Sequence, residues 1–267
     1  MGYKQEVYAF YEQLKTYDEQ LMNREYDYIG ICKELSKMHL EKRVKKNVDF
    51  KSIKNLFVRT IAPLGKDTND YYRNTISKMK IDRTSELASG DALIVGNDKG
   101  KTIFLTNRSF KDIDFIAFSH ELGHTPAIDF TTSKDYYEYG EVLSMFFEYL
   151  SCKTIEERDA YELFLRERLI SVKEDSFTLL RAKKEFKNND SYKDQFIECT
   201  GKSIFRYFIS LDYTLQLIER YKQDRQVVND SIDSIIVDRN NFRKLEERLD
   251  IDTRDCKTLI KTARSFR

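Results

Sequence analysis

The sequence is poor in residues that end helices: its 267 residues include nine glycines and two prolines. A β fold with many turns needs both residue types, so their scarcity favours long helices. A chain of this length suits one large domain, or at most two small ones. Its 40% hydrophobic and 13% aromatic residues can fill a sizeable core.

The sequence also has no marked excess of positive or negative residues. Lysine plus arginine number 46 and aspartate plus glutamate 45. A nucleic-acid-binding protein needs a basic surplus on one face, and this balance gives no support for one. We therefore expect no nucleic-acid partner.

Further absences bear on location. The first residues, MGYKQEVYAFYEQLK, lack the apolar region of a secretory signal, and no uncharged apolar run approaches the length of a membrane span. No CxxC pair occurs among the four scattered cysteines, which argues against a cysteine-rich zinc site. We expect reduced thiols, no membrane association and a cytoplasmic protein. The cysteines are Cys32, Cys152, Cys199 and Cys256.

Apolar residues recur at helical spacing along most of the chain. We expect charged loops between the helices, including one just before residue 241 and a charged turn after residue 172. The expected helices span residues 3–46, 50–61, 70–79, 156–172, 177–186, 203–221 and the chain from about 241.

One region departs from this helical pattern. Residues 91–96 and 101–106 are short β-rich runs, and turn-forming residues lie between them. They predict a small β-hairpin or sheet. Residues 109–112 follow it and have the character of a helix N-terminus.

The central stretch, residues 115–150, carries the chemistry. His120 and His124 stand four residues apart in DFIAFSHELGH, which places both imidazoles on one helix face, able to share a tetrahedral ion. Glu121 lies beside the first histidine, where its carboxylate can act as general base on a zinc-bound water. Gly123 allows a neighbouring element to approach closely. An HExxH match also occurs by chance, but here it lies in an apolar helix.

A zinc site of this kind needs a third protein ligand. The only other histidine, His39, lies far upstream in a charged segment and is expected at the surface. The metzincin pattern needs a third histidine six residues after His124, where this chain has Phe130. A carboxylate from a following helix is therefore expected.

The run GEVLSMFFEYL can supply this carboxylate. It is apolar nearly all round, except for a polar stripe formed by Glu141, Ser144 and Glu148. Since a buried carboxylate needs a partner, we predict that Glu141 is the third ligand, with Glu138 as the alternative. We assign Glu148, together with Ser144, to the support of the ligands, Glu148 by orienting a histidine. A solvated or purely structural Glu148 is the competing interpretation.

These residues resemble the thimet oligopeptidase and oligoendopeptidase F family of zinc peptidases. The family's second motif, E-V-x-S-x-x-x-E, is matched by Glu141, Val142, Ser144 and Glu148. The run KTIFLTNRSFKDIDFIAFSHELGH is similar to the family's strand, loop and ligand helix. The resemblance covers residues 55–150. The chain is about half the usual family length and has no histidine after His124, so it resembles a compact or truncated member.

The resemblance implies a mainly helical, zincin-type catalytic domain with a small β-hairpin or sheet before the HExxH helix. It also implies one zinc ion per chain, short peptides as substrates, and a tyrosine that stabilises the oxyanion. Tyr207 and Tyr213, in the late aromatic segment, are the candidates, with core packing as the alternative for each. We predict a single domain over residues 1–267, with a helical part over 1–85 and the zinc-site core and C-terminal helices over 86–267.

The leading hypothesis is a cytoplasmic zinc metalloendopeptidase of the oligoendopeptidase type. One alternative is a repressor-cleaving zinc peptidase of a mobile element, whose second motif usually lacks E-V-x-S. Another is a degenerate peptidase fold that binds peptides without cleaving them. The intact His120, Glu121, His124 and Glu141 argue against the latter.

Overall fold

The computed structural model describes residues 28–40, 45–97, 100–129, 134–156, 158–185, 191–238 and 242–267. The fold is mainly helical and contains a small three-stranded sheet, as predicted. The chain forms two compact units, one of residues 1–39, 169–209 and 253–267, the other of residues 40–168 and 210–252. The single catalytic domain stays a prediction. No helix in the described part of the chain is long and apolar enough to cross a membrane.

The first unit contains α2 (Tyr28–Leu35), η2 (Arg254–Cys256) and α12 (Lys257–Arg264), with parts of α8 (Ala160–Glu185) and α9 (Ser191–Gln223). Helix α2 packs against α12. Glu34 of α2 pairs with Arg264 at 3.1 Å and with Arg267 at 2.5 Å. Lys37, Arg267 and Arg264 lower the pKa of Glu34 to about 2.

The sheet of the second unit has the strand order β1-β3-β2. Strand β2 (Ala92–Asn97) pairs antiparallel with β3 (Gly100–Thr106), and the pair Asn97–Gly100 closes the predicted hairpin. Strand β1 (Lys80–Thr84) adds a parallel pairing to β3. Ile103 and Leu105 of β3 are fully buried.

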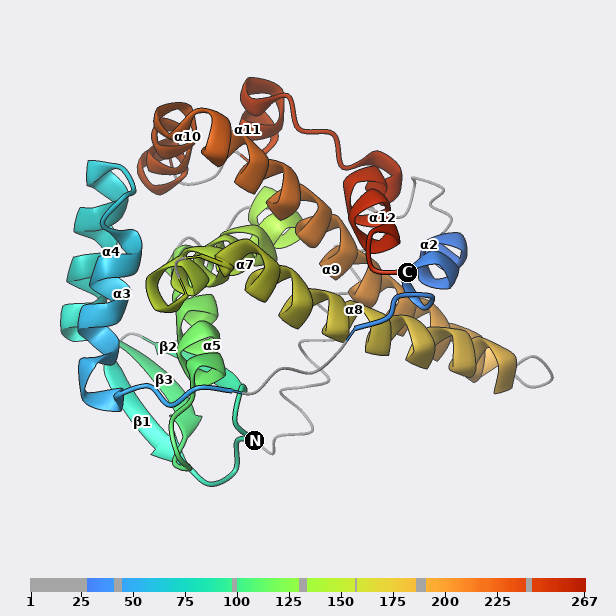
Figure 1. The fold of residues 1–267 in the computed structure, drawn as a ribbon, viewed down its shortest axis with the longest axis horizontal. Coiled ribbons are helices and arrows are strands. Elements are labelled where there is room, and N and C mark those ends of the chain that lie inside the picture. The colour runs from blue at the N-terminus through green and yellow to red at the C-terminus, as the bar shows by residue number, and fades with distance from the viewer. Residues whose placement is uncertain are drawn as a thin grey trace. The chain divides into compact units, whose positions relative to one another are not determined.

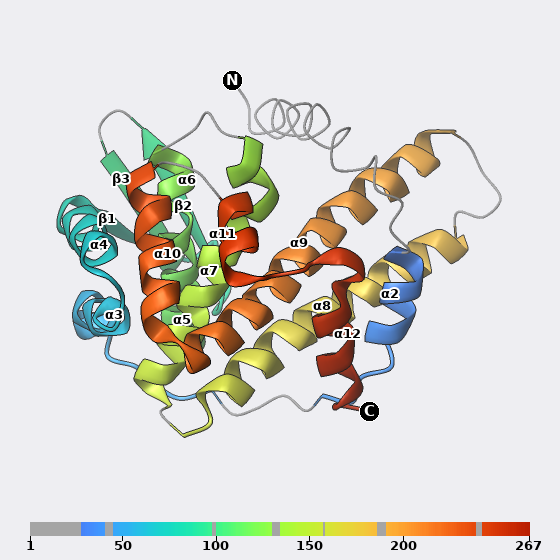
Figure 2. The same ribbon diagram turned by 90° about the horizontal axis from the view of Figure 1, so that it is seen from above.

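Helix α5 (Asp112–Gly123) packs against β2 and β3, and α7 (Lys134–Ile155) packs against α5 (Figure 1). The short helix α6 (Thr125–Asp129) lies between them in the chain. Helices η1 (Phe50–Ser52), α3 (Ile53–Ile61) and α4 (Lys66–Lys78) precede the sheet, and α3 also contacts α7. Helix α10 (Arg225–Asp238) packs against α4 and against α11 (Phe242–Leu249) (Figure 2).

A cluster of four buried aromatic rings joins four of these helices. Phe57 of α3 makes edge-to-face contacts with Tyr72 of α4, Phe118 of α5 and Phe147 of α7, with ring centroids 5.7–6.0 Å apart. Each such pair adds about 0.5–1.5 kcal/mol beyond the burial of its apolar area. The cluster therefore fixes α5 and α7 against a common support.

The N-terminus of α5 is anchored by a buried carboxylate. Asp114 accepts hydrogen bonds from the backbone N–H groups of Lys111 (2.6 Å) and Gly90 (2.7 Å) and from the Ser89 hydroxyl (3.0 Å). Lys111 directly precedes the helix, so this contact satisfies one of the amides that a helix start leaves unpaired. The predicted N-terminal boundary at residues 109–112 is confirmed.

Several helix boundaries differ from the predictions. Residues 36–40 and 45–46 are not helical, and the earlier part of the predicted helix 3–46 lies outside the described residues. The charged turn expected after residue 172 is absent from α8, because lysine, glutamate and aspartate do not break a helix that lacks glycine and proline. The buried Ser176 hydroxyl also bonds to the Val172 carbonyl oxygen within α8, at 2.7 Å.

Helix α10 and strand β1 were not predicted. The segment expected to be a charged loop before residue 241 contains α10, whose buried Val228, Ile232 and Ile235 recur at helical spacing between charged residues. Its Asp233 accepts hydrogen bonds from the backbone N–H and hydroxyl of Thr68, at 2.9 and 2.6 Å, and so caps the first turn of α4. Strand β1 has only one apolar residue, Ile81, and owes its conformation to pairing with β3.

The backbones of α5 and α7 meet at Gly123. A Cβ atom placed there would lie 2.3 Å from the Cα atom and 2.6 Å from the nitrogen of Ser144. The predicted close approach at this glycine is confirmed, and α7 is the element that makes it.

We expect Gly123→Ala to force the two helices apart, because the atoms it would meet are backbone atoms. Overpacking a well-packed core destabilises by about 1–3 kcal/mol, and a clash with backbone should reach at least the upper end. Chemical denaturation measures this loss.

Ser144→Ala is the matched control for Gly123→Ala. Its buried hydroxyl has no hydrogen-bond partner among the described residues, so its removal should change stability by less than about 1 kcal/mol. Equal losses in the two variants would contradict a tight contact at Gly123.

Candidate metal centre

The residues of the candidate centre come from α5, from its C-cap residue His124 and from α7. Phe115, Phe118 and Leu122 bury the core-facing side of α5, and this leaves His120 and His124 half-buried. Glu141, in α7, is also half-buried. The predicted ligands thus lie at the edge of the core, where solvent can still reach them.

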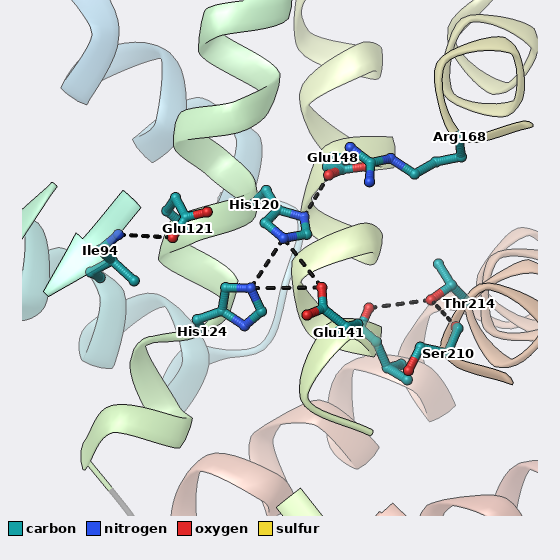
Figure 3. Close-up of polar contacts among 10 residues, drawn as sticks. Ile94, His120, Glu121, His124, Glu141, Glu148, Arg168, Ser210 and Thr214 are labelled. Atoms are coloured by element: carbon teal, nitrogen blue, oxygen red, sulfur yellow. Dashed lines mark hydrogen bonds and ion pairs between the residues drawn. The ribbon is translucent and has the colours of Figure 1, made fainter. Parts of the chain in front are cut away.

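The three predicted ligand side chains converge on one point (Figure 3). The Nε2 atoms of His120 and His124 are 3.0 Å apart. Oε2 of Glu141 lies 3.3 Å from Nε2 of His120 and 3.7 Å from Nε2 of His124. Ligand atoms that surround a zinc ion tetrahedrally at about 2.0–2.2 Å lie about 3.3–3.6 Å from one another. The observed separations of 3.0, 3.3 and 3.7 Å lie within about 0.3 Å of the edges of such a tetrahedron.

Glu148 orients the first histidine. Its Oε1 lies 2.6 Å from Nδ1 of His120, and its carboxylate is only 1% exposed. Since a carboxylate is an acceptor, Nδ1 donates this hydrogen bond. In the neutral ring the lone pair is then on Nε2, which faces His124 and Glu141. This is the contact that the predicted supporting role of Glu148 requires, and the role itself stays a prediction.

The donor set fits a metal ion. A nitrogen lone pair of His120 and a carboxylate oxygen of Glu141 face each other at a distance at which two acceptors repel. A proton or a cation must lie between them. Two imidazoles and one carboxylate form the ligand set of catalytic zinc sites, which keep a fourth position open. The residues His120, His124 and Glu141 together could hold a metal ion.

The charges around His120 also favour a cation in the centre. Burial alone would lower the pKa of His120, but the carboxylates of Glu148 and Glu141 outweigh it and raise that pKa to about 10. The site therefore attracts positive charge, and a proton supplies it when no metal does.

Glu121 is bound to the sheet through one of its two carboxylate oxygens. Its Oε2 accepts a hydrogen bond of 2.9 Å from the backbone N–H of Ile94 in β2. Burial raises the pKa of Glu121, while His120 and the Ile94 N–H lower it in part. A carboxylate with a raised pKa is suited to accept a proton and then return it.

Helix α9 contacts α7 next to the third ligand. The hydroxyl of Thr214 lies 3.4 Å from the carbonyl oxygen of Val142, the neighbour of Glu141, and donates to the Ser210 carbonyl oxygen at 2.8 Å (Figure 3). This contact supports the backbone of α7 at the ligand.

The remaining predicted residues have other positions. Ser144 is fully buried against Gly123. Tyr213 is fully buried in α9, and the half-buried Tyr207 belongs to the other compact unit. A role for either tyrosine at the oxyanion stays a prediction. The side chain of Glu138 lies outside the described residues.

Arg168 was not predicted. Its Nε atom lies 2.5 Å from Oε2 of Glu148, so this carboxylate contacts a positive group on each side. A signal was present in the sequence, because Arg168 shares one helix face with the buried Leu165, Leu169 and Val172. A charged residue within an apolar stripe needs a buried partner.

Comparisons with protein-family models, with curated proteins and with solved structures find no match for this chain. The resemblance to the oligopeptidase family therefore stays a prediction from the motifs alone.

Because the carboxylates raise the pKa of His120, the metal-free centre holds a proton at neutral pH that a metal ion must displace. Well below pH 10 nearly every metal-free centre holds this proton, so that each zinc ion must displace one. As the pH approaches 10, fewer centres hold the proton and zinc affinity depends less on pH. We expect zinc affinity to rise about tenfold per pH unit between pH 6 and 8. Competition with a chromophoric chelator, corrected for the chelator's own protonation, measures it. An affinity independent of pH would mean that no ligand loses a proton.

Proposed function

We propose that this protein is a zinc-dependent metalloendopeptidase that hydrolyses short peptides in the cytoplasm. The observation that carries the proposal is the arrangement of His120, His124 and Glu141, whose ligand atoms lie 3.0–3.7 Å apart, with Glu121 adjacent in the chain. A zinc ion in this position acts as a Lewis acid on a carbonyl oxygen and lowers the pKa of a coordinated water.

The residues of the candidate site have different roles in this proposal. His120 and His124 present nitrogen lone pairs, and Glu141 brings one negative charge. Glu148 fixes the ring of His120 through Nδ1. Glu121, with its raised pKa, accepts a proton from the attacking water and delivers it to the leaving amine.

The position of β2 supports a peptide as the substrate. β2 pairs with β3 on one side and, among the described residues, with no strand on its other side. Its Ile94 N–H points at Glu121, so this free edge faces the candidate centre. Extended peptides bind to free strand edges through main-chain hydrogen bonds. A small sheet of this kind, packed on the HExxH helix, also supports the zincin-type assignment.

We expect Glu121→Gln to bind zinc like the wild-type chain, one ion per chain, but to lose hydrolysis by about 10²–10⁴-fold, because glutamine cannot accept the proton. Cleavage of a quenched fluorescent peptide library, read beside zinc content, measures both effects. Full hydrolysis by this variant would exclude Glu121 as the base. Cleavage of a single folded protein in place of short peptides would favour the repressor-cleaving alternative.

Glu141→Ala should lower zinc affinity by at least about tenfold, because it removes one of three protein ligands. Glu162→Ala is the control, since Glu162 is an exposed residue that pairs with Arg166 on α8. Chelator competition compares the two variants. An unchanged affinity in Glu141→Ala would mean that another group is the third ligand.

A further inference from the structure

Glu148 lies between His120 and Arg168, hydrogen-bonded to the first through Oε1 and ion-paired with the second through Oε2. Oε1 contacts Nδ1 of His120 at 2.6 Å, and Oε2 contacts Nε of Arg168 at 2.5 Å (Figure 3). The three side chains come from α5, α7 and α8, and they form a chain of contacts that ends at the candidate metal centre.

The carboxylate of Glu148 cannot orient a ring unless it is itself held. A glutamate side chain rotates about three single bonds, and at 1% exposure no bulk solvent fixes its oxygens. The contact with Arg168 fixes Oε2, and so fixes the direction in which Oε1 faces His120. Arginine suits this position because its guanidinium is planar and always charged.

Arg168 is itself well shielded, since only 16% of its side chain is exposed. Arg166, two residues earlier in the same helix, pairs with Glu162 one turn away and is 36% exposed. Exposed pairs of this kind contribute little. Among the described residues, two arginines of α8 thus pair with glutamates: Arg166 within the helix and Arg168 with Glu148 of α7. Only the second pair leads to His120.

We propose that Arg168 is a positioning residue for the metal centre, which acts through Glu148 to hold the His120 ring with Nε2 directed at the ion. The inference rests on the proposed metal centre, but not on peptide hydrolysis. Arg168 contacts neither the ligand atoms nor a substrate in this assignment, so its effect passes entirely through one carboxylate.

The experiment measures zinc affinity of the full chain by chelator competition. Arg168→Gln should lower the affinity about tenfold or more, since partners of metal ligands typically contribute 10–100-fold. Arg168→Lys, which keeps the charge, should recover part of this loss. Arg166→Gln, the matched control, should bind zinc like the wild-type chain. Thermal unfolding of the metal-free proteins checks that each variant is folded.

A double-mutant comparison separates this role from a general structural one. In a Glu148→Gln background, Arg168→Gln should change zinc affinity by less than about twofold, because the connection to His120 is already broken. An equal loss in both backgrounds, or equal affinities for Arg168→Gln and Arg166→Gln, would overturn the inference. A wild-type chain that binds zinc but cleaves no peptide would refute the peptidase and leave the role of Arg168 intact. A wild-type chain that binds no zinc would overturn both.

Discussion

The close contact of α5 with α7 at Gly123 and Ser144 is the constraint on which the candidate centre depends. His120 belongs to α5, His124 caps its C-terminus and Glu141 belongs to α7, so the spacing of the two helices sets how closely the ligand atoms approach, here within 4.8 Å. A side chain at position 123 would occupy the space of the Ser144 backbone. The aromatic cluster around Phe57 supports both helices from one side, and the Asp114 carboxylate anchors the start of α5.

This helix contact brings polar groups to the edge of an apolar core, where each needs a partner. Glu148 is held between His120 and Arg168, and Glu121 is held by the Ile94 N–H. Glu141 and the two imidazoles face one another across a short gap. The negative charge of Glu141 at the centre of this arrangement attracts a cation. The burial and charge of these side chains thus favour a cation at the same position as the ligand geometry does.

The parts of the site that depend on local sequence could be predicted. The spacing of His120 and His124 follows from the helix period, and the polar stripe of α7 indicates Glu141 and Glu148. The hairpin and the start of α5 were also evident from turn-forming and capping residues. Each of these features depends on residues that lie close together in the sequence.

What the sequence did not reveal depends on contacts between distant segments. β1 has little apolar alternation and is a strand because β3 pairs with it, and α10 is an amphipathic helix among charged residues that resemble a loop. Arg168 is 20 residues from Glu148 and in another helix, so their contact arises only from packing. The division of the chain into two compact units likewise follows from long-range contacts.

X-ray absorption spectroscopy of the zinc-loaded protein tests the metal centre most directly, because it reports the atoms bound to the ion. A centre formed by His120, His124 and Glu141 predicts four nitrogen or oxygen neighbours at about 2.0–2.2 Å, multiple-scattering features of two imidazoles, and no sulfur. A sulfur neighbour at about 2.3 Å, fewer than two imidazoles, or the same spectrum in a His124→Ala variant would contradict it.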